Sequence, residues 1–286
     1  MHQPVMLEEA LEHLAIRPEG IYLDATAGLG GHTGAIARRL TTGLVIANDR
    51  DPESLEMARV NTADVAGRIR WHHGRFSTLH EALQENGVAQ VDGLLADLGV
   101  SRFQLTSAER GFSILTEGPL DMRMDQTTGT TAADLVNYTA EKALADLIYQ
   151  LGEERRARKI ARAIVRARPI RSTRHLADVV ERVAPRTGRL HPATLTFQAL
   201  RMACNEEQPE LDHLLDRVPE LVKPGGRAVI ISFMSLEDRK VKVRFRDLQQ
   251  QGRAAVLTKH PLRPTEEETQ ANPAARSAKL RALAMN

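Results

Sequence analysis

The first hundred residues alternate short apolar runs with amphipathic stretches. The apolar runs predict four β-strands, at residues 21–25, 44–48, 68–72 and 91–97. Between them, apolar residues recur at the spacing of a helix that covers a core. Strands that alternate with helices in this way are typical of a parallel sheet with helices on both faces. The pattern therefore predicts an α/β protein.

The alternation stops after Asp97 and returns near residue 211. Residues 98–130 are rich in glycine and other turn formers, and residues 131–185 read as helices, with Thr131 as a helix N-cap. From residue 211 the pattern predicts a helix, a turn at 223–226, and strands at 227–233, 253–259 and 279–285.

We therefore expect a sheet domain made from residues 1–105 and 199–286, with an all-helical insertion at 106–198. The insertion leaves the sheet at the carboxyl end of the fourth strand. Open α/β sheets bind their ligands at that edge. The helical domain is thus expected to recognise the substrate, as one wall of a cleft or as a lid.

A glycine-rich loop follows the first strand, in the sequence IYLDATAGLGGHTG at 21–34. Its glycines let the backbone approach a ligand closely at the start of a helix. Asp49 ends the second strand, 21 residues after Gly28. Nucleotide-binding βαβ units place the carboxylate that holds ribose hydroxyls at about this distance. The loop and Asp49 together predict an adenosine-containing cofactor, although an ordinary turn of an α/β protein would read similarly.

The loop fits S-adenosylmethionine better than a dinucleotide or a nucleoside triphosphate. Thr33 stands where a dinucleotide fingerprint has its third glycine, and the Gly-Lys-Ser/Thr of a phosphate loop is absent. S-adenosylmethionine carries a ribose and a sulfonium but no phosphate. We therefore expect this cofactor.

The fourth strand ends in Asp97–Leu98–Gly99–Val100. An exocyclic amine of a nucleobase is a poor nucleophile, so an enzyme that methylates it must accept its hydrogen bonds and hold it in line with the methyl group. Asp97 is the candidate for this catalytic role; a helix cap or turn acid is the alternative. In the following loop, Phe103 and Phe112 could stack an extruded base or anchor the loop.

Composition sets the remaining limits. A net charge of +2 with 27% charged residues is ordinary for a globular protein. No apolar run approaches the roughly 20 residues of a membrane span, and no secretory signal is evident at the N-terminus. Cys204 is the single cysteine and lies outside any Pro-Cys motif, which argues against ring-carbon methylation through a cysteine adduct. We expect a cytoplasmic protein with no membrane partner.

Residues 153–174 carry nine Lys or Arg and two acids. Apolar residues within this segment repeat at helical spacing, at Ala157, Ile160, Ala161 and Ile164. The basic residues therefore share the other faces of one helix, which suits contact with RNA phosphates, while a merely solvated face is the alternative.

The chain resembles the RsmH (MraW) family of ribosomal small-subunit RNA methyltransferases over nearly its full length. The matching blocks include HQPVMLEE (2–9), DATAGLGGHT (24–33), NDRDP (48–52), DLGVSRFQL (97–105), RGFSILTEGPLDMRMD (110–125), GEERRARKIARAI (152–164), HPATLTFQALR (191–201), PGGRAVIISFMSLEDR (224–239) and NPAARSAKLR (272–281). The resemblance implies N4-methylation of a cytidine in the decoding region of 16S ribosomal RNA. It also implies a class I methyltransferase sheet with an inserted helical domain.

The resemblance also assigns residues to the site. The implied cofactor contacts are Gly30, Gly31, His32, Asp49, Phe76, Asp97 and Gln104. The candidate substrate-binding residues are Phe103, Arg110, Phe112, Asp121, Arg123, Arg155, Arg158, Arg162, Ser232 and Arg239. The implied partner is 16S ribosomal RNA or the small ribosomal subunit, and the sequence leaves open whether the protein is a homodimer.

The chain departs from the family at a few positions. Met234 stands where the family usually has histidine, Leu195 where it has arginine, and Arg102 where it has serine. Two other interpretations remain. A nucleotide-dependent oxidoreductase is disfavoured by the missing third glycine, and a non-catalytic RNA-binding or ribosome assembly protein has Met234 as its best support.

Overall fold

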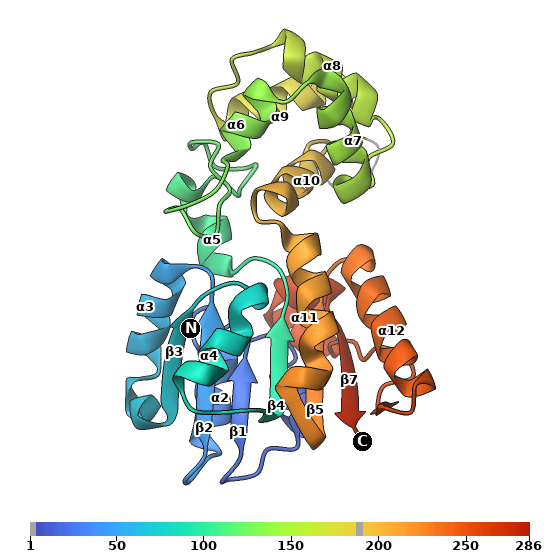
Figure 1. The fold of residues 1–286 in the computed structure, drawn as a ribbon. Helices are drawn as coiled ribbons and strands as arrows, with labels where there is room; N and C mark the ends of the chain where they lie inside the picture. Colours follow the sequence, from blue (N-terminus) through green and yellow to red (C-terminus); the bar gives the residue numbers. More distant parts are fainter. Residues whose placement is uncertain (1–3, 187–190) are drawn as a thin grey trace. The chain divides into compact units, whose positions relative to one another are not determined.

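The computed structural model describes residues 4–186 and 191–286, which form two compact units. The first unit contains a seven-stranded sheet with the order β3-β2-β1-β4-β5-β7-β6 (Figure 1). Strands β1 to β5 are parallel, and β7 is antiparallel to both of its neighbours. The strands are β1 Ile21–Asp24, β2 Leu44–Asp49, β3 Ile69–His73, β4 Val91–Asp97, β5 Val222–Ser232, β6 Ala254–Val256 and β7 Lys279–Met285. The predicted class I methyltransferase sheet is confirmed.

Apolar side chains alternate between the two faces of this sheet, and helices cover both. On one face, Leu94 and Ile230 pack with helices α4 (Leu79–Glu85), α11 (Glu207–Leu221) and α12 (Ser235–Gln250). On the other face, Leu95 and Val229 pack with α1 (Leu7–Leu14), α2 (Gly31–Arg38) and α3 (Pro52–Asn61). Strands buried on both faces explain why the apolar runs in the sequence are nearly continuous.

The start of β5 differs from the prediction. A turn was expected at residues 223–226, whereas β5 already begins at Val222 and runs through them. The register along β4 jumps from Val91, opposite Val222, to Gly93, opposite Arg227. The Pro-Gly-Gly residues are thus accommodated as an irregularity within the strand, as expected for a β-bulge.

The second unit, residues 100–207, is helical and has its own apolar core. Its helices are α5 Arg102–Thr106, α6 Ala132–Tyr138, α7 Glu141–Gly152, α8 Ala157–Arg166, α9 Thr173–Glu181 and α10 Thr194–Cys204. Thr131 is the N-cap of α6, as predicted, and accepts a hydrogen bond from Asp134 N. The expected insertion, 106–198, is shorter at both ends than the helical unit in the structure, 100–207. The unit extends further because Val100 and the buried Leu200 of α10 pack in the helical core.

Within residues 4–186 and 191–286, no helix has the length and apolar character needed to span a membrane.

Candidate functional site at the carboxyl ends of the strands

The candidate site residues of the sheet unit gather where β1, β2 and β4 end. Asp24, Asp49 and Asp97 are the last residues of these three strands. Strand β1 lies between β2 and β4 in the sheet, and the three parallel strands end at the same edge (Figure 1). The chain order reverses between β1 and β4, and ligands of open α/β sheets bind at such a reversal.

The loop between β1 and α2 has a backbone shape that favours glycine. Gly28 and Gly30 have φ values of +51° and +86°, in the left-handed region. A Cβ on Gly30 would lie 2.9 Å from Thr62 Cγ2 and 3.2 Å from the carbonyl oxygen of Ala58. The loop is therefore packed closely against α3, and its backbone leads directly into the N-terminus of α2, where amide groups are available to a ligand.

Asp49 is fixed by two backbone amides of the site. Its Oδ2 accepts a hydrogen bond from Gly28 N at 2.7 Å, and its Oδ1 accepts one from Asp51 N at 2.9 Å. Burial raises the pKa of Asp49 to about 6, and the two amides oppose this rise. Each carboxylate oxygen has a second lone pair. An acceptor with spare capacity beside a loop with glycine at positions 28, 30 and 31 fits the ribose of an adenosyl cofactor.

Asp24 ties the two ends of the glycine loop together. Its fully buried carboxyl accepts hydrogen bonds from Thr33 Oγ1 at 2.6 Å and from Thr26 N at 3.1 Å. Thr26 Oγ1 in turn accepts a hydrogen bond from Asp97 N at 2.6 Å. Burial raises the pKa of Asp24 to about 6. The sequence placed Asp24 beside the loop, but only the structure shows that it connects the loop to β4.

Asp97 differs from Asp24 and Asp49 in that one of its carboxylate oxygens is buried and has no hydrogen-bond partner among the described residues. Among the described residues, nothing donates a hydrogen bond to its Oδ1, while its Oδ2 lies 3.8 Å from His32 Nδ1. Burial, and then the charges of Asp24, Glu237 and Glu268, raise the pKa of Asp97 well above its usual range. A buried acceptor without a donor costs free energy, and native proteins keep few of them. Oδ1 is therefore suited to a donor group of a ligand or substrate.

The other implied cofactor residues differ in what their side chains do. The imidazole of His32 is buried and its Nε2 bonds to Val5 O at 3.1 Å. Phe76, at the start of the turn after β3, is half-buried against the sheet core. Gln104 lies in the helical unit, where its Oε1 accepts a hydrogen bond from Ser101 N and forms a capping box at α5. Cofactor contacts by these residues remain predictions.

The candidate substrate residues after α5 are used within the helical unit. Arg110 is 3% exposed; its Nη2 donates to the carbonyl of Met124 at 2.7 Å, and its guanidinium lies 6.0 Å from the ring centroids of Phe103 and Phe112. Phe112 itself is part of the helical core. The structure thus gives Arg110 and Phe112 packing roles, so any direct contact with a base is better sought from the less buried Phe103.

Asp121 and Arg123 form a bidentate ion pair, with both N–O distances 2.8 Å. Burial alone would raise the pKa of Asp121, but the hydrogen bonds and charge of Arg123 outweigh it and hold that pKa below its usual range. The pair stiffens the loop before α6. A role for either residue in binding substrate remains a prediction.

The block around Met234 joins β5 to α12, and the end of β5 pairs with the end of β4, with Ile231 opposite Asp97. Ser232, the last residue of β5, is buried, and Arg239 is exposed on α12. Buried Glu237 accepts hydrogen bonds from the backbone amides of Phe233 and Met234, both at 3.2 Å. Sequence reasoning did not single out Glu237, although it lies in a block that matches the family.

Helix α8 has the two faces predicted for it. It buries Ala157, Ile160, Ala161 and Ile164, and its basic residues are exposed. Arg162 pairs with Glu141 of α7 at 3.3 Å. Within the described part of the chain, no acid pairs with the exposed cations Arg155, Arg158, Lys159 and Arg166. Sequence reasoning missed the exposed aromatic residues of this unit, Tyr138 (83% exposed) and Tyr149.

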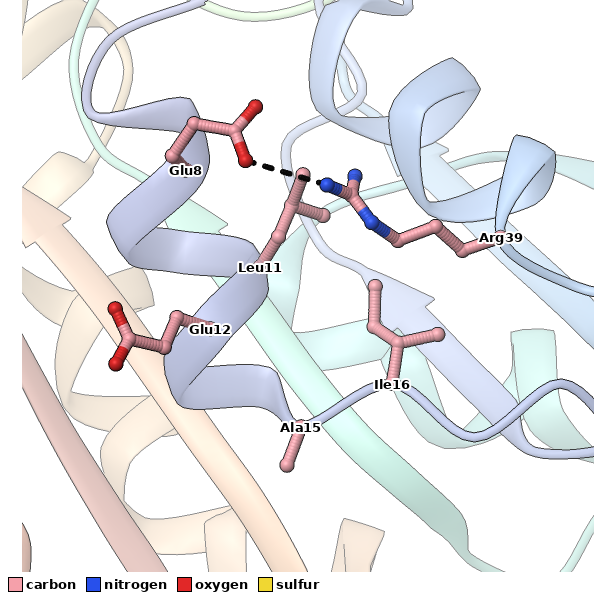
Figure 2. A pocket seen from close by; sticks show the side chains of 6 residues that line it. All are labelled: Glu8, Leu11, Glu12, Ala15, Ile16 and Arg39. Carbon is pink, nitrogen blue, oxygen red and sulfur yellow. Dashed lines mark hydrogen bonds and ion pairs between the residues drawn. The ribbon is translucent and has the colours of Figure 1, made fainter.

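A separate hollow of about 540 Å³ lies between α1 and the C-terminal end of α2 (Figure 2). Glu8 and Arg39 form an ion pair at 3.2 Å on its rim, and Leu11 and Ile16 contribute apolar side chains. Arg39 follows α2, whereas the glycine loop precedes it. The hollow is therefore not the candidate site, and none of the predicted residues lines it.

Comparison with known proteins gives a consistent result. A family model described as the MraW methylase family matches residues 1–286. The chain is 68% identical over 285 residues to the ribosomal RNA small subunit methyltransferase H of Solibacter usitatus, with both chains covered in full. It is 50% identical over 291 residues to the protein of that name from Acidobacterium capsulatum, covering 98% of this chain and 97% of the relative. The protein of that name from Koribacter versatilis is 51% identical over 293 residues, with 99% and 93% covered.

We expect Asp49→Ala to weaken S-adenosylmethionine binding by about 2 kcal/mol, or roughly 30-fold in Kd, because it removes charge-assisted hydrogen bonds. Calorimetry measures this affinity directly. Asp64→Ala, which removes an exposed carboxylate paired with Arg38, is the control and should bind normally. Equal affinities for the two variants would rule out the ribose assignment.

The raised pKa of Asp24 predicts a pH dependence of stability. A carboxyl whose pKa is raised on folding stabilises the protein below its unfolded pKa and loses this contribution as pH rises through the folded value, here about 6. Asp24→Asn should therefore gain stability over the wild type between pH 4 and 7, by about 3 kcal/mol at most. Urea unfolding across this range measures the difference. A difference in unfolding free energy that stays constant from pH 4 to 7 would show that burial does not raise the pKa of Asp24.

Proposed function

Because the chain belongs to the MraW methylase family, we propose that it methylates N4 of one cytidine in the decoding region of 16S ribosomal RNA. The cofactor is S-adenosylmethionine. The observation that carries the proposal is Asp97, whose buried Oδ1 has no donor among the described residues and lies at the carboxyl end of β4. The substrate is proposed to reach the enzyme in the cytoplasm, as free RNA or within an assembling small subunit.

The residues present fit the cofactor. Asp49 would hold the ribose. The glycine loop packs closely against Thr62, Ala58 and Pro4 at Gly30 and Gly31 and would present its backbone to the cofactor. When bound, S-adenosylmethionine supplies an electrophilic methyl group on a sulfonium. The protein's own contribution is to bring the nucleophile into line and to exclude water.

Asp97 would activate the exocyclic amine. Its Oδ1 accepts a hydrogen bond from the N4 amine, which turns the nitrogen lone pair out of conjugation with the ring, and it takes the proton that the nitrogen loses. No covalent adduct is required. The pKa of the Cys204 thiol is raised to about 12, chiefly by burial, so this cysteine is a poor nucleophile for attack on a pyrimidine ring.

The helical unit would recognise the RNA. The exposed cations of α8 suit phosphate groups, and the exposed Tyr138 and Tyr149 offer aromatic faces to unpaired bases. Arg110, Asp121 and Arg123 would act indirectly, by holding the loop between β4 and α6 in one conformation.

Asp97→Asn should remain folded and lose at least roughly 100-fold in methyl transfer to small-subunit RNA, because the amide is a weaker acceptor and cannot take a proton. The same change should raise the melting temperature, since it removes the cost of a buried charge. Asp64→Asn is the matched control for both measurements. Near-wild-type turnover of Asp97→Asn would reduce Asp97 to a turn residue.

The basic face of α8 should provide affinity that does not depend on RNA sequence. Replacing Arg155, Arg158 and Arg162 by alanine should flatten the dependence of binding on salt, by roughly 0.7 in the log–log slope for each phosphate that the variant no longer neutralises. A control removes three exposed cations of the sheet unit, Lys242, Arg246 and Arg253. If both triple variants keep the wild-type slope, α8 does not bind phosphates.

A further inference from the structure

The segment Pro4–Met6 lies against the glycine loop, although nothing in the proposed reaction requires it there. A Cβ on Gly31 would lie 3.0 Å from Pro4 Cγ. Val5 O accepts a hydrogen bond from His32 Nε2 at 3.1 Å, and Met6 N donates to Glu268 Oε1 at 2.6 Å. The block at residues 2–9, which the sequence analysis noted without a role, thus supplies a backbone carbonyl to the site.

This carbonyl fixes the protonation of one ring nitrogen. A carbonyl oxygen can only accept, so Nε2 of His32 must carry a proton. The ring is 5% exposed, so its orientation is set by packing and by this bond. Its Nδ1 then faces Asp97 Oδ2 at 3.8 Å, which is too long for a hydrogen bond. Nδ1 donates to a carboxylate only when the ring carries a second proton, so a hydrogen bond that forms here in a complex joins a His32 cation to the Asp97 carboxylate.

The two oxygens of Asp97 are therefore in different surroundings. Oδ2 faces His32, and Oδ1 has no partner among the described residues. The other titratable groups whose charges act on this carboxyl are Asp24, Glu237 and Glu268, all acids. His32 is thus the basic side chain placed to favour the charged form of Asp97.

We propose that His32 is a positioning residue for the reaction, oriented by the Val5 carbonyl so that its Nδ1 holds Asp97 Oδ2 and leaves Oδ1 for the amine of the substrate. The inference rests on the proposed function of Asp97. It assigns the His32 imidazole to the carboxylate, so that any contact of this residue with the cofactor is left to its backbone.

Two substitutions separate the two ring nitrogens. His32→Asn keeps an amide near the position of Nδ1 and loses the bond to Val5, whereas His32→Gln keeps a donor near Nε2 and loses the group that faces Asp97. We expect His32→Gln to lose at least roughly 30-fold in kcat with little change in the Kd for S-adenosylmethionine or in KM for RNA, and His32→Asn to retain most of kcat. The reverse order would mean that His32 serves only to anchor residues 4–6, and would overturn the proposal.

A second measurement uses the free protein and needs no turnover. The His32 ring nitrogens are followed by NMR as pH is varied, in the wild type and in Asp97→Asn. A coupled pair predicts that the pKa of His32 falls by about one unit or more when the Asp97 charge is removed. An unchanged His32 titration would contradict the proposal even if the enzyme methylates RNA as expected. Absence of methylation with a coupled titration would instead count against the proposed function alone.

Discussion

A half-buried carboxyl group, whose buried Oδ1 has no hydrogen-bond partner among the described residues, is the constraint around which the rest of the site is arranged. Asp97 lies near Asp24, Glu237 and Glu268, so its charged form is disfavoured by burial and by three like charges. The protein supports this arrangement with hydrogen bonds among the neighbouring groups: Thr26 accepts from the backbone of Asp97, and Thr33 and Thr26 donate to Asp24. A free-energy cost of this kind is expected at a functional site, where a side chain keeps a hydrogen-bonding position for a ligand.

The same edge of the sheet explains how the cofactor and nucleophile sites come together. Parallel strands place their carboxyl ends on one side, and the order of β2, β1 and β4 brings Asp49, Asp24 and Asp97 into a row. Gly28 joins the first two, because its amide binds Asp49 while its loop is closed by Asp24. A methylase must hold its methyl donor and its acceptor next to each other. Asp49 at the end of β2 and Asp97 at the end of β4 are placed to bind one each.

Much of this arrangement could be predicted from local sequence. Continuous apolar runs identified β1 to β4, since strands buried on both faces have no polar alternation. The spacing from Gly28 to Asp49 indicated a nucleotide-binding βαβ unit, and the structure adds the hydrogen bond between these two residues. The bulge at residues 222–227 could not be predicted, because Pro-Gly-Gly encodes a turn and a bulge equally well. The contacts of Val5 with His32 and of Met6 with Glu268 join residues 27 and 262 positions apart, and periodicity carries no information about such pairs.

The helical unit shows the limits of predicting a role from residue type alone. Arg110 was a candidate for substrate binding, but its guanidinium is buried against backbone carbonyls. Phe112 could have stacked a base or anchored the loop, and its place in the helical core agrees with the second alternative. By contrast, the face of α8 followed from its period, because four apolar positions at helical spacing leave the cations only the exposed side. The helical unit spans residues 100–207 instead of the expected 106–198. Val100 and α10 pack with the helical core, and such contacts between distant residues cannot be read from local sequence.

The measurement that tests the account most directly is mass mapping of methylated nucleosides after the protein acts on small-subunit RNA or particles. An amine acceptor at Asp97, without a reactive cysteine, predicts N4-methylcytidine at a single position. The product 5-methylcytidine, or methylation spread over many cytidines, would contradict the account of both the chemistry and the substrate.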